Sequence, residues 1–174
     1  APAVRGKQAC LCRHQAGISG RVRHASFPPI AGPDTRLLIL GSLPGAASLA
    51  AGRYYAHPRN QFWTLVGDAV GRPLATLDYP ARIAALQAAG IGLWDVIADA
   101  ARHGSLDAAI RAPAPNDLRA FVGTLPALRT IAFNGATAAR IGIAQLGEAA
   151  GRFRLLRLPS SSPAHAVPIA AKQA

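Results

Sequence analysis

The sequence has no long apolar stretch, and this absence argues against a protein that spans a membrane with a helix. No run of about 18 apolar residues occurs, so we expect no membrane-spanning helix and no membrane partner. The basic N-terminus also lacks the apolar core of a secretory signal. Together these absences favour a soluble protein of the cytoplasm.

Cysteine is nearly absent as well. Cys10 and Cys12 are the only two, and two thiols cannot complete a structural zinc site or a four-cysteine iron–sulfur cluster. A disulfide between residues so close in sequence would be strained. We therefore interpret both as incidental thiols. Because no cluster of metal ligands is apparent, we expect no metal and no redox cofactor.

Acidic residues are scarce relative to basic ones. The chain has 19 Lys and Arg against 8 Asp and Glu, which gives a net charge of +11. Residues 34–174 alone hold fourteen cations and eight acids, a balance of +6. Such a domain suits a polyanionic partner such as nucleic acid, because each phosphate contact releases condensed counterions. A genome-wide preference for arginine codons is the alternative explanation of this charge.

The chain length of 174 residues allows one domain with a sizeable core. Residues 1–33 mix Gly, Pro, Ser, Arg and His without periodicity, so we expect a basic, partly disordered extension there. The folded domain is expected over residues 34–174.

Within that domain, short apolar runs alternate with stretches of helical periodicity. The predicted strands lie at 37–40, 91–97, 130–133 and 153–158. The predicted helices lie at 60–70, at 79–89, from a cap at Asn116 or Asp117 to 122, and at 135–146. This alternation predicts an α/β fold, namely a three-layer α/β/α sandwich around a central four-stranded, mostly parallel sheet. Ligands of such sheets bind outside the carboxyl ends of the strands.

Six short motifs follow one another along residues 36–166, mostly at these strand ends. They are GSLPG at 41–45, SL at 48–49, YYAHPRNQFW at 54–63, GLWDV at 92–96, FNG at 133–135 and LPSSSPAHA at 158–166. In this combination the chain resembles the uracil-DNA glycosylase superfamily, most closely its hypoxanthine-DNA glycosylase branch, often called family 6. The resemblance implies a monofunctional DNA glycosylase of base excision repair. Such an enzyme flips a deaminated base out of DNA and hydrolyses its N-glycosidic bond. Hypoxanthine is the expected preferred base, and uracil and xanthine are the expected weaker substrates.

The resemblance also assigns a catalytic residue. Sister families carry a carboxylate or amide in the first motif to hold the attacking water, but here that position holds Ser42 or Leu43. The role therefore moves to Asn60, whose amide can orient water but cannot take up its proton. The alternative is that Asn60 caps the following helix. Ser42 is expected to bond to backbone in its turn.

A base pocket is implied at Gly41, Ser42, Leu43, Tyr54, Tyr55, His57, Asp95 and Asn134. The two tyrosines either stack on the extruded base or pack at the rim of the sheet. Asp95 either accepts a hydrogen bond from N1–H of hypoxanthine or serves as a helix cap or salt-bridged acid. Asn134 either contacts the substrate or shapes a strand-to-helix turn. His57 is a candidate donor to the base or a phosphate.

DNA contacts are implied at Arg59, Ser160, Ser161, Ser162, Pro163, Ala164 and His165. The serines form a loop suited to gripping phosphates, and Pro163–Ala164 resembles the wedge that fills the stack after the base leaves. His165 either assists the leaving base or is a solvated loop residue. Members of the branch usually continue into a C-terminal helix, whereas this sequence ends at Ala174, which indicates a truncated or disordered end.

Lysine is scarce too, since Lys7 and Lys172 are the only two. Neither lies in the expected core, which argues against Schiff-base chemistry and hence against lyase activity. We expect a monomer whose partner is DNA containing a deaminated base, in association with the nucleoid. Two other functions stay open, a catalytically silent DNA-binding module and an esterase with Ser42 as nucleophile. The esterase is the weaker, because the G-x-S-x-G elbow is absent.

Overall fold

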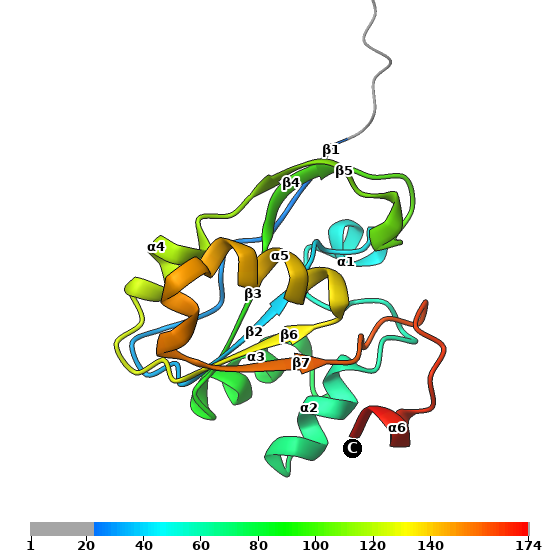
Figure 1. Cartoon of the computed structure of the whole chain (residues 1–174). Coiled ribbons are helices and arrows are strands. Elements are labelled where there is room, and N and C mark those ends of the chain that lie inside the picture. The colour runs from blue at the N-terminus through cyan, green and yellow to red at the C-terminus, as the bar shows by residue number, and fades with distance from the viewer. Residues whose placement is uncertain (1–22, 174) are drawn as a thin grey trace, which may run out of the picture.

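The computed structural model describes residues 23–173, with a four-stranded sheet as its central layer (Figure 1). In spatial order the strands are β3 (Ile91–Asp95), β2 (Leu37–Gly41), β6 (Thr130–Asn134) and β7 (Arg154–Leu158). All neighbouring pairs in this sheet are parallel. The predicted α/β class with a four-stranded, mostly parallel sheet is therefore confirmed.

The helices are α1 (Ala46–Ala51), α2 (Phe62–Val70), α3 (Tyr79–Ala88), α4 (Leu118–Gly123), α5 (Ala136–Leu146) and α6 (Ile169–Gln173). Short 3-10 turns form η1 (Leu74–Thr76), η2 (Asp107–Ala109) and η3 (Gly147–Arg152). The cap predicted at Asn116 or Asp117 is confirmed at Asp117, which begins α4, and Asp78, which was not predicted as a cap, begins α3 with a proline in its first turn.

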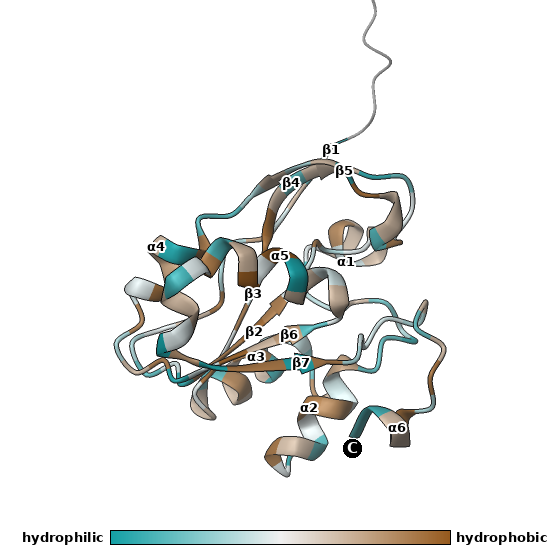
Figure 2. Ribbon diagram, viewed as in Figure 1, coloured by the Kyte–Doolittle hydropathy of each residue, from teal (hydrophilic) through white to brown (hydrophobic). Residues whose placement is uncertain are grey.

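Alternate residues of β2 enter two different hydrophobic cores, as expected of a strand covered on both faces. Leu38 and Leu40 pack with residues of α4 and α5, whereas Ile39 packs with residues of α2 and α3. The helices accordingly lie above and below the sheet in Figure 1, and Figure 2 shows the hydrophobic residues gathered along β2 and β3 between them. This is the predicted three-layer sandwich.

A second, three-stranded sheet was not predicted. It consists of β1 (Arg23–Ala25), β4 (Ile97–Ala101) and β5 (Arg111–Pro115), antiparallel in the order β1-β4-β5. The single strand predicted at 91–97 is therefore wrong. It ends at Asp95 because the next residue, Val96, donates its N–H to Gly41 O and accepts from the Asn116 N–H, which turns the chain into the second sheet.

Both ends of the described chain differ from the sequence-based expectation. The domain boundary at residue 34 is too late, because β1 pairs with β4 and Ile30 bridges to Leu93. Residues 1–22, with both cysteines, lie outside the described residues. At the other end α6 is helical rather than disordered, and Gln173 Nε2 donates to Asp68 Oδ2 of α2 over 2.7 Å. In residues 23–173 no helix is long and apolar enough to cross a membrane.

The two sheets together determine where a ligand can enter. The carboxyl ends of β2, β3 and β6 share one edge of the parallel sheet, since these strands pair in register. The chain beyond β3 continues through β4 and returns to that edge as the loop 102–107. This loop contacts the segment that follows β2, because Arg102 donates to the carbonyl oxygens of Leu43 and Pro44.

Candidate active site

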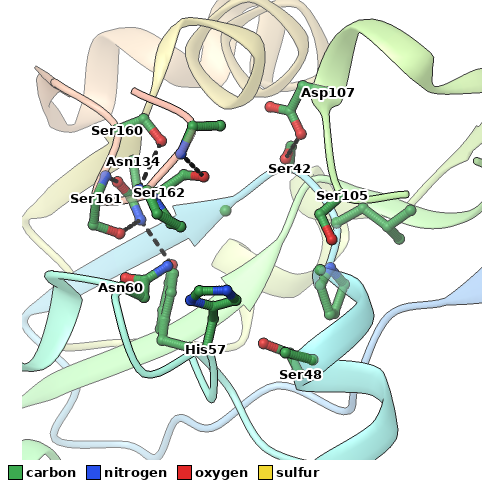
Figure 3. A pocket seen from close by; sticks show the side chains of 18 of the residues that line it. Ser42, Ser48, His57, Asn60, Ser105, Asp107, Asn134, Ser160, Ser161 and Ser162 are labelled. Atoms are coloured by element: carbon green, nitrogen blue, oxygen red, sulfur yellow. Dashed lines mark hydrogen bonds between the residues drawn. The ribbon is translucent and has the colours of Figure 1, made fainter. Parts of the chain in front are cut away.

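A pocket of about 270 Å³ lies at this edge of the parallel sheet (Figure 3). The predicted site residues that line it are Gly41, Ser42, Leu43, Tyr54, Tyr55, His57, Asn60, Asp95, Asn134, Ser160, Ser161, Ser162, Pro163, Ala164 and His165. Arg59 is the exception, because it is exposed and lies outside the lining. The lining residues that fall outside the predicted motif positions include Ala47, Ser105, Leu106 and Asp107.

Asn60 lines the pocket and, from the position before Gln61, the N-cap residue of α2, bonds to the first residue of that helix. Its Oδ1 accepts the Phe62 N–H over 2.9 Å, and its own N–H donates to His57 O over 2.8 Å. The helix begins at Phe62 with Gln61 as its N-cap residue, so the capping alternative holds only as this one side-chain bond, hereafter called the Asn60 cap. Figure 3 shows Asn60 and His57 on one side of the pocket, and Ser42 on the other.

The two tyrosines are packed against neighbouring rings. Tyr55 stacks on Phe62 with ring centroids 3.7 Å apart and planes 9° apart. Tyr54 is buried and meets the Phe27 ring edge-on at 5.1 Å. Burial, and then the nearby Asp95, raise the pKa of both hydroxyls. The packing alternative therefore holds for Tyr54, while Tyr55 has one face covered by Phe62.

Asp95 is a buried carboxyl at the floor of the pocket, 3% exposed. It accepts a hydrogen bond from Ser26 Oγ over 2.8 Å. Burial raises its pKa to about 7, against the opposing effects of the Ser26 hydroxyl, the Tyr54 hydroxyl and the Arg102 guanidinium. It neither caps a helix nor forms an ion pair, since the single ion pair of residues 23–173 joins Arg23 and Asp99. The structural alternative for Asp95 was therefore wrong.

Gly41 makes room for that carboxyl. A Cβ atom at this position would lie 2.6 Å from Asp95 Oδ1 and 3.4 Å from Tyr55 Oη. Side chains cannot approach so closely, so a larger residue at Gly41 would displace the acid from beneath the strand end.

Asn134 holds the serine loop against the sheet. Its Oδ1 accepts the Ser161 N–H over 2.9 Å, and its Nδ2 donates to Ser161 Oγ over 2.9 Å and to Tyr55 Oη over 3.2 Å. Ser161 is consequently buried, whereas Ser160 Oγ and Ser162 Oγ accept backbone N–H groups of their own loop. The hydroxyls of residues 160–162 thus fix the shape of the loop.

Ser42 does not bond to backbone as expected. Its hydroxyl donates to Asp107 Oδ1 over 2.7 Å, because η2 brings Asp107 to the pocket wall beside the first motif. Sequence reasoning missed Asp107. The only signal was its rarity, as one of eight acids in the chain, and no spacing rule connects it with Ser42.

The two histidines occupy different surroundings. His57 Nδ1 accepts the Arg59 N–H over 3.1 Å, which shapes the loop before α2. His165 is exposed at the pocket rim and donates its N–H to Ser162 O over 3.0 Å. Among residues 23–173, no group of three or more His, Cys, Asp or Glu side chains could hold a metal ion.

A parallel sheet with an aromatic, amide and hydroxyl-lined pocket at its carboxyl edge places the chain among α/β enzymes with a site at the strand ends. A family model described as the uracil DNA glycosylase superfamily matches residues 28–173, and the chain therefore belongs to this superfamily. The resemblance inferred from the motifs is confirmed.

Two curated relatives and one solved structure, all from Methanosarcina, illustrate the similarity. A hypoxanthine DNA glycosylase of Methanosarcina barkeri is 39% identical over 114 residues, covering 66% of this chain and 72% of the relative. A hypoxanthine DNA glycosylase of Methanosarcina acetivorans is 41% identical over 109 residues, covering 63% and 69%. The solution NMR structure of a candidate uracil DNA glycosylase from Methanosarcina acetivorans superposes with a TM-score of 0.73 at 38% identity, covering 82% of this chain and 87% of that one.

Proposed function

We propose that this chain is a monofunctional DNA glycosylase of base excision repair that hydrolyses the N-glycosidic bond of deaminated bases, hypoxanthine first. The observation that carries the proposal is the convergence of Asn60, Asp95 and Asn134 on one pocket, from three segments far apart in sequence. Superfamily membership supports the reaction class, and the relatives named hypoxanthine DNA glycosylases support the base.

The base would enter the pocket after flipping out of the DNA stack. Asp95 is the proposed reader of its Watson–Crick edge, because a carboxylate on the pocket floor can accept from N1–H of hypoxanthine. Tyr55 offers the ring face that Phe62 does not cover, and His57 is a further candidate donor. Gly41, Ser42 and Leu43 line the wall beside the base.

Asn60 is the proposed holder of the attacking water. Cleavage of an N-glycosidic bond develops positive charge on the sugar, so a placed water contributes more than a strong nucleophile. The cap to Phe62 uses one lone pair of Oδ1 and leaves the second for a water O–H. Lys172, the lysine within the described residues, does not line the pocket, which fits hydrolysis rather than Schiff-base chemistry.

The DNA backbone is proposed to follow the loop that closes the pocket. The partly exposed hydroxyls of Ser160 and Ser162 suit phosphate contacts, whereas buried Ser161 supports the loop. Exposed Arg59 suits an ion pair with a further phosphate. Pro163 and Ala164 are the proposed wedge, with His165 beside them at the rim. We propose a monomer acting on the chromosome, since all the proposed site residues come from one chain.

One experiment tests the function directly. The protein is incubated with duplexes that carry a single inosine, uracil or xanthine, and hot alkali then cleaves any abasic site. We expect strand cleavage, strongest with inosine, and none with undamaged duplex. A protein that retards these duplexes in a gel but yields no alkali-labile site would instead be a silent DNA-binding module, and the proposal would be wrong.

A further inference from the structure

We infer that Asp107, acting through the Ser42 hydroxyl, accepts the proton of the attacking water. The inference rests on the proposed function and adds a group that the reaction otherwise lacks, because the Asn60 amide can orient a water but cannot take up its proton. Ser42 would touch the water as a catalytic residue. Asp107 would act behind it as a positioning and proton-accepting residue.

The hydrogen bond between Ser42 and Asp107 has a defined direction. Ser42 Oγ lies 2.7 Å from Asp107 Oδ1, and since an ionised carboxylate has no hydrogen, the serine must be the donor. Its oxygen lone pairs are then available to accept from a water in the pocket, which both residues line. Figure 3 shows the pair on the pocket wall across from Asn60, so both acceptors face the same pocket.

The loop that carries Asp107 is fastened to the first motif by contacts of its own. Arg102 is buried and donates to the carbonyl oxygens of Leu43 and Pro44. Ser105 Oγ accepts the Ala46 N–H over 3.0 Å at the start of α1. The Ser42–Asp107 hydrogen bond is therefore one of several contacts that fasten the loop to the first motif.

The water oxygen forms a bond to C1′ as the C1′–N9 bond breaks and its electron pair leaves with the base. One water proton passes to Ser42 Oγ while the proton of Ser42 passes to Asp107, so the serine ends unchanged. The base anion takes a proton from solvent, and Asp107 later releases its proton to solvent.

Several charged or titratable groups face this pair, and each bears on a pH-dependent test. Asp95 lies on the pocket floor, the Arg102 charge acts on both acids, and His57 and His165 approach from the α2 loop and the serine loop. Asp95 is the rival acid. Burial raises its pKa to about 7, which suits a proton acceptor, but its hydroxyl partner is Ser26, whereas the Ser42 hydroxyl donates to Asp107.

The test compares Asp107→Asn with Asp34→Asn under single-turnover conditions on an inosine duplex. Both substitutions remove one negative charge, but Asp34 is exposed and lies outside the pocket. Asparagine at 107 can still accept the Ser42 hydrogen bond through Oδ1, so a merely structural role would be retained. We expect Asp107→Asn to lower the rate constant by about 10²-fold at pH 8, and Asp34→Asn to leave it within twofold.

The pH profile separates a proton acceptor from a hydrogen-bond acceptor. The Asp107 charge is one of the causes that raise the pKa of Asp95, so Asp107→Asn is compared with its parent in the Asp95→Asn background, where Asp95 no longer titrates. In this background we expect the ratio of the rate constants with aspartate and with asparagine at position 107 to vary with pH, because a proton acceptor makes the rate depend on pH and a hydrogen-bond acceptor does not. A ratio that stays near one at every pH overturns the inference.

A second variant guards against a folding defect and tests the relay itself. Ser42→Ala should slow base release, and the double variant Ser42→Ala/Asp107→Asn should be no slower than the slower single variant, because both break one relay. If the rate losses of the two single variants multiplied in the double variant, the inference would be overturned. Wild-type activity that survives Asp107→Asn would refute this inference alone, whereas wild-type protein that releases no base would refute the proposed function and this step with it.

Discussion

Asn60 and Phe62 are joined by a hydrogen bond in which the Phe62 backbone N–H donates to Asn60 Oδ1 over 2.9 Å. Capping and water placement are competing roles for this side chain at the level of sequence. The structure makes them compatible, because an amide oxygen has two lone pairs and the cap occupies one. The cap also fixes the direction of the amide, which is what a water-holding group requires.

Asn60→Ala should abolish detectable base release from an inosine duplex while costing about 1 kcal/mol of stability, since it removes a cap as well as the proposed water ligand. In a protein of this size, that cost lowers Tm by about 2–4 °C. Single-turnover strand cleavage and thermal unfolding measure the two effects separately.

Asp78→Ala is the matched control for the lost cap. Asp78 Oδ1 accepts the Ala81 N–H over 2.9 Å at the start of α3, outside the pocket. This variant should lose similar stability and keep its base release. If Asn60→Ala retained near-normal turnover, Asn60 would be a cap alone.

Asp95→Asn should change the choice of base. At pH 8, above its raised pKa of about 7, the ionised carboxylate only accepts hydrogen bonds, whereas an amide both donates and accepts and can pair with both edges of uracil. We expect the ratio of hypoxanthine to uracil excision to fall by about 2- to 10-fold, the range of one hydrogen bond. Parallel single-turnover rates on inosine and uracil duplexes give this ratio, and an unchanged value would remove Asp95 from the base-reading residues.

Asp95 should also make stability depend on pH in an unusual direction. Burial raises its pKa from 3.8 to about 7, so the folded protein holds this proton more tightly than the unfolded chain does. Stability from this group is therefore complete below about pH 4 and is lost as pH rises towards 7, by up to about 4 kcal/mol. Because asparagine does not titrate, Asp95→Asn should gain stability relative to wild type between pH 5 and pH 8.

Urea unfolding at both pH values measures this difference, and the titrations of other groups cancel when the two proteins are compared. Asp34→Asn, which removes an exposed acid, should show no such gain. Equal differences at pH 5 and pH 8 for Asp95→Asn would contradict a raised pKa at this carboxyl.

The parallel sheet could be predicted because each strand is a short apolar run with local boundaries. Leu37–Gly41, for example, is buried on both faces, and its sequence carries no competing helical period. The antiparallel sheet could not be predicted in this way. Its edge strand β5 is mostly exposed, contains two prolines and pairs with β4 through irregular register. Nothing local in such a segment indicates a strand.

The residues of the candidate site likewise fall into those that local sequence patterns predict and those that they do not. Asn60, Asp95 and Asn134 could be found because they stand at the ends of predicted elements and within recognisable motifs. Asp107, which lines the pocket, and Ser26, which bonds to Asp95 behind it, could not be found, because each takes its place through a contact between distant segments. Ser26 meets Asp95 across 69 positions and Asp107 meets Ser42 across 65, and no pattern in the sequence carries that information.

Asn134→Ala should loosen the serine loop, because the Asn134 amide makes three hydrogen bonds, two to Ser161 and one to Tyr55. Their loss leaves polar atoms of buried Ser161 without partners, which costs about 1–3 kcal/mol. Since the loop also carries the proposed wedge, we expect weaker binding of damaged duplex by fluorescence anisotropy and slower base release.

Gln145→Ala provides the control, because Gln145 Nε2 donates to Val96 O over 2.7 Å outside the pocket lining. This control variant should lower stability and leave DNA binding and turnover unchanged. If Asn134→Ala behaved in the same way, the hydrogen bonds between Asn134 and the serine loop would have no part in function.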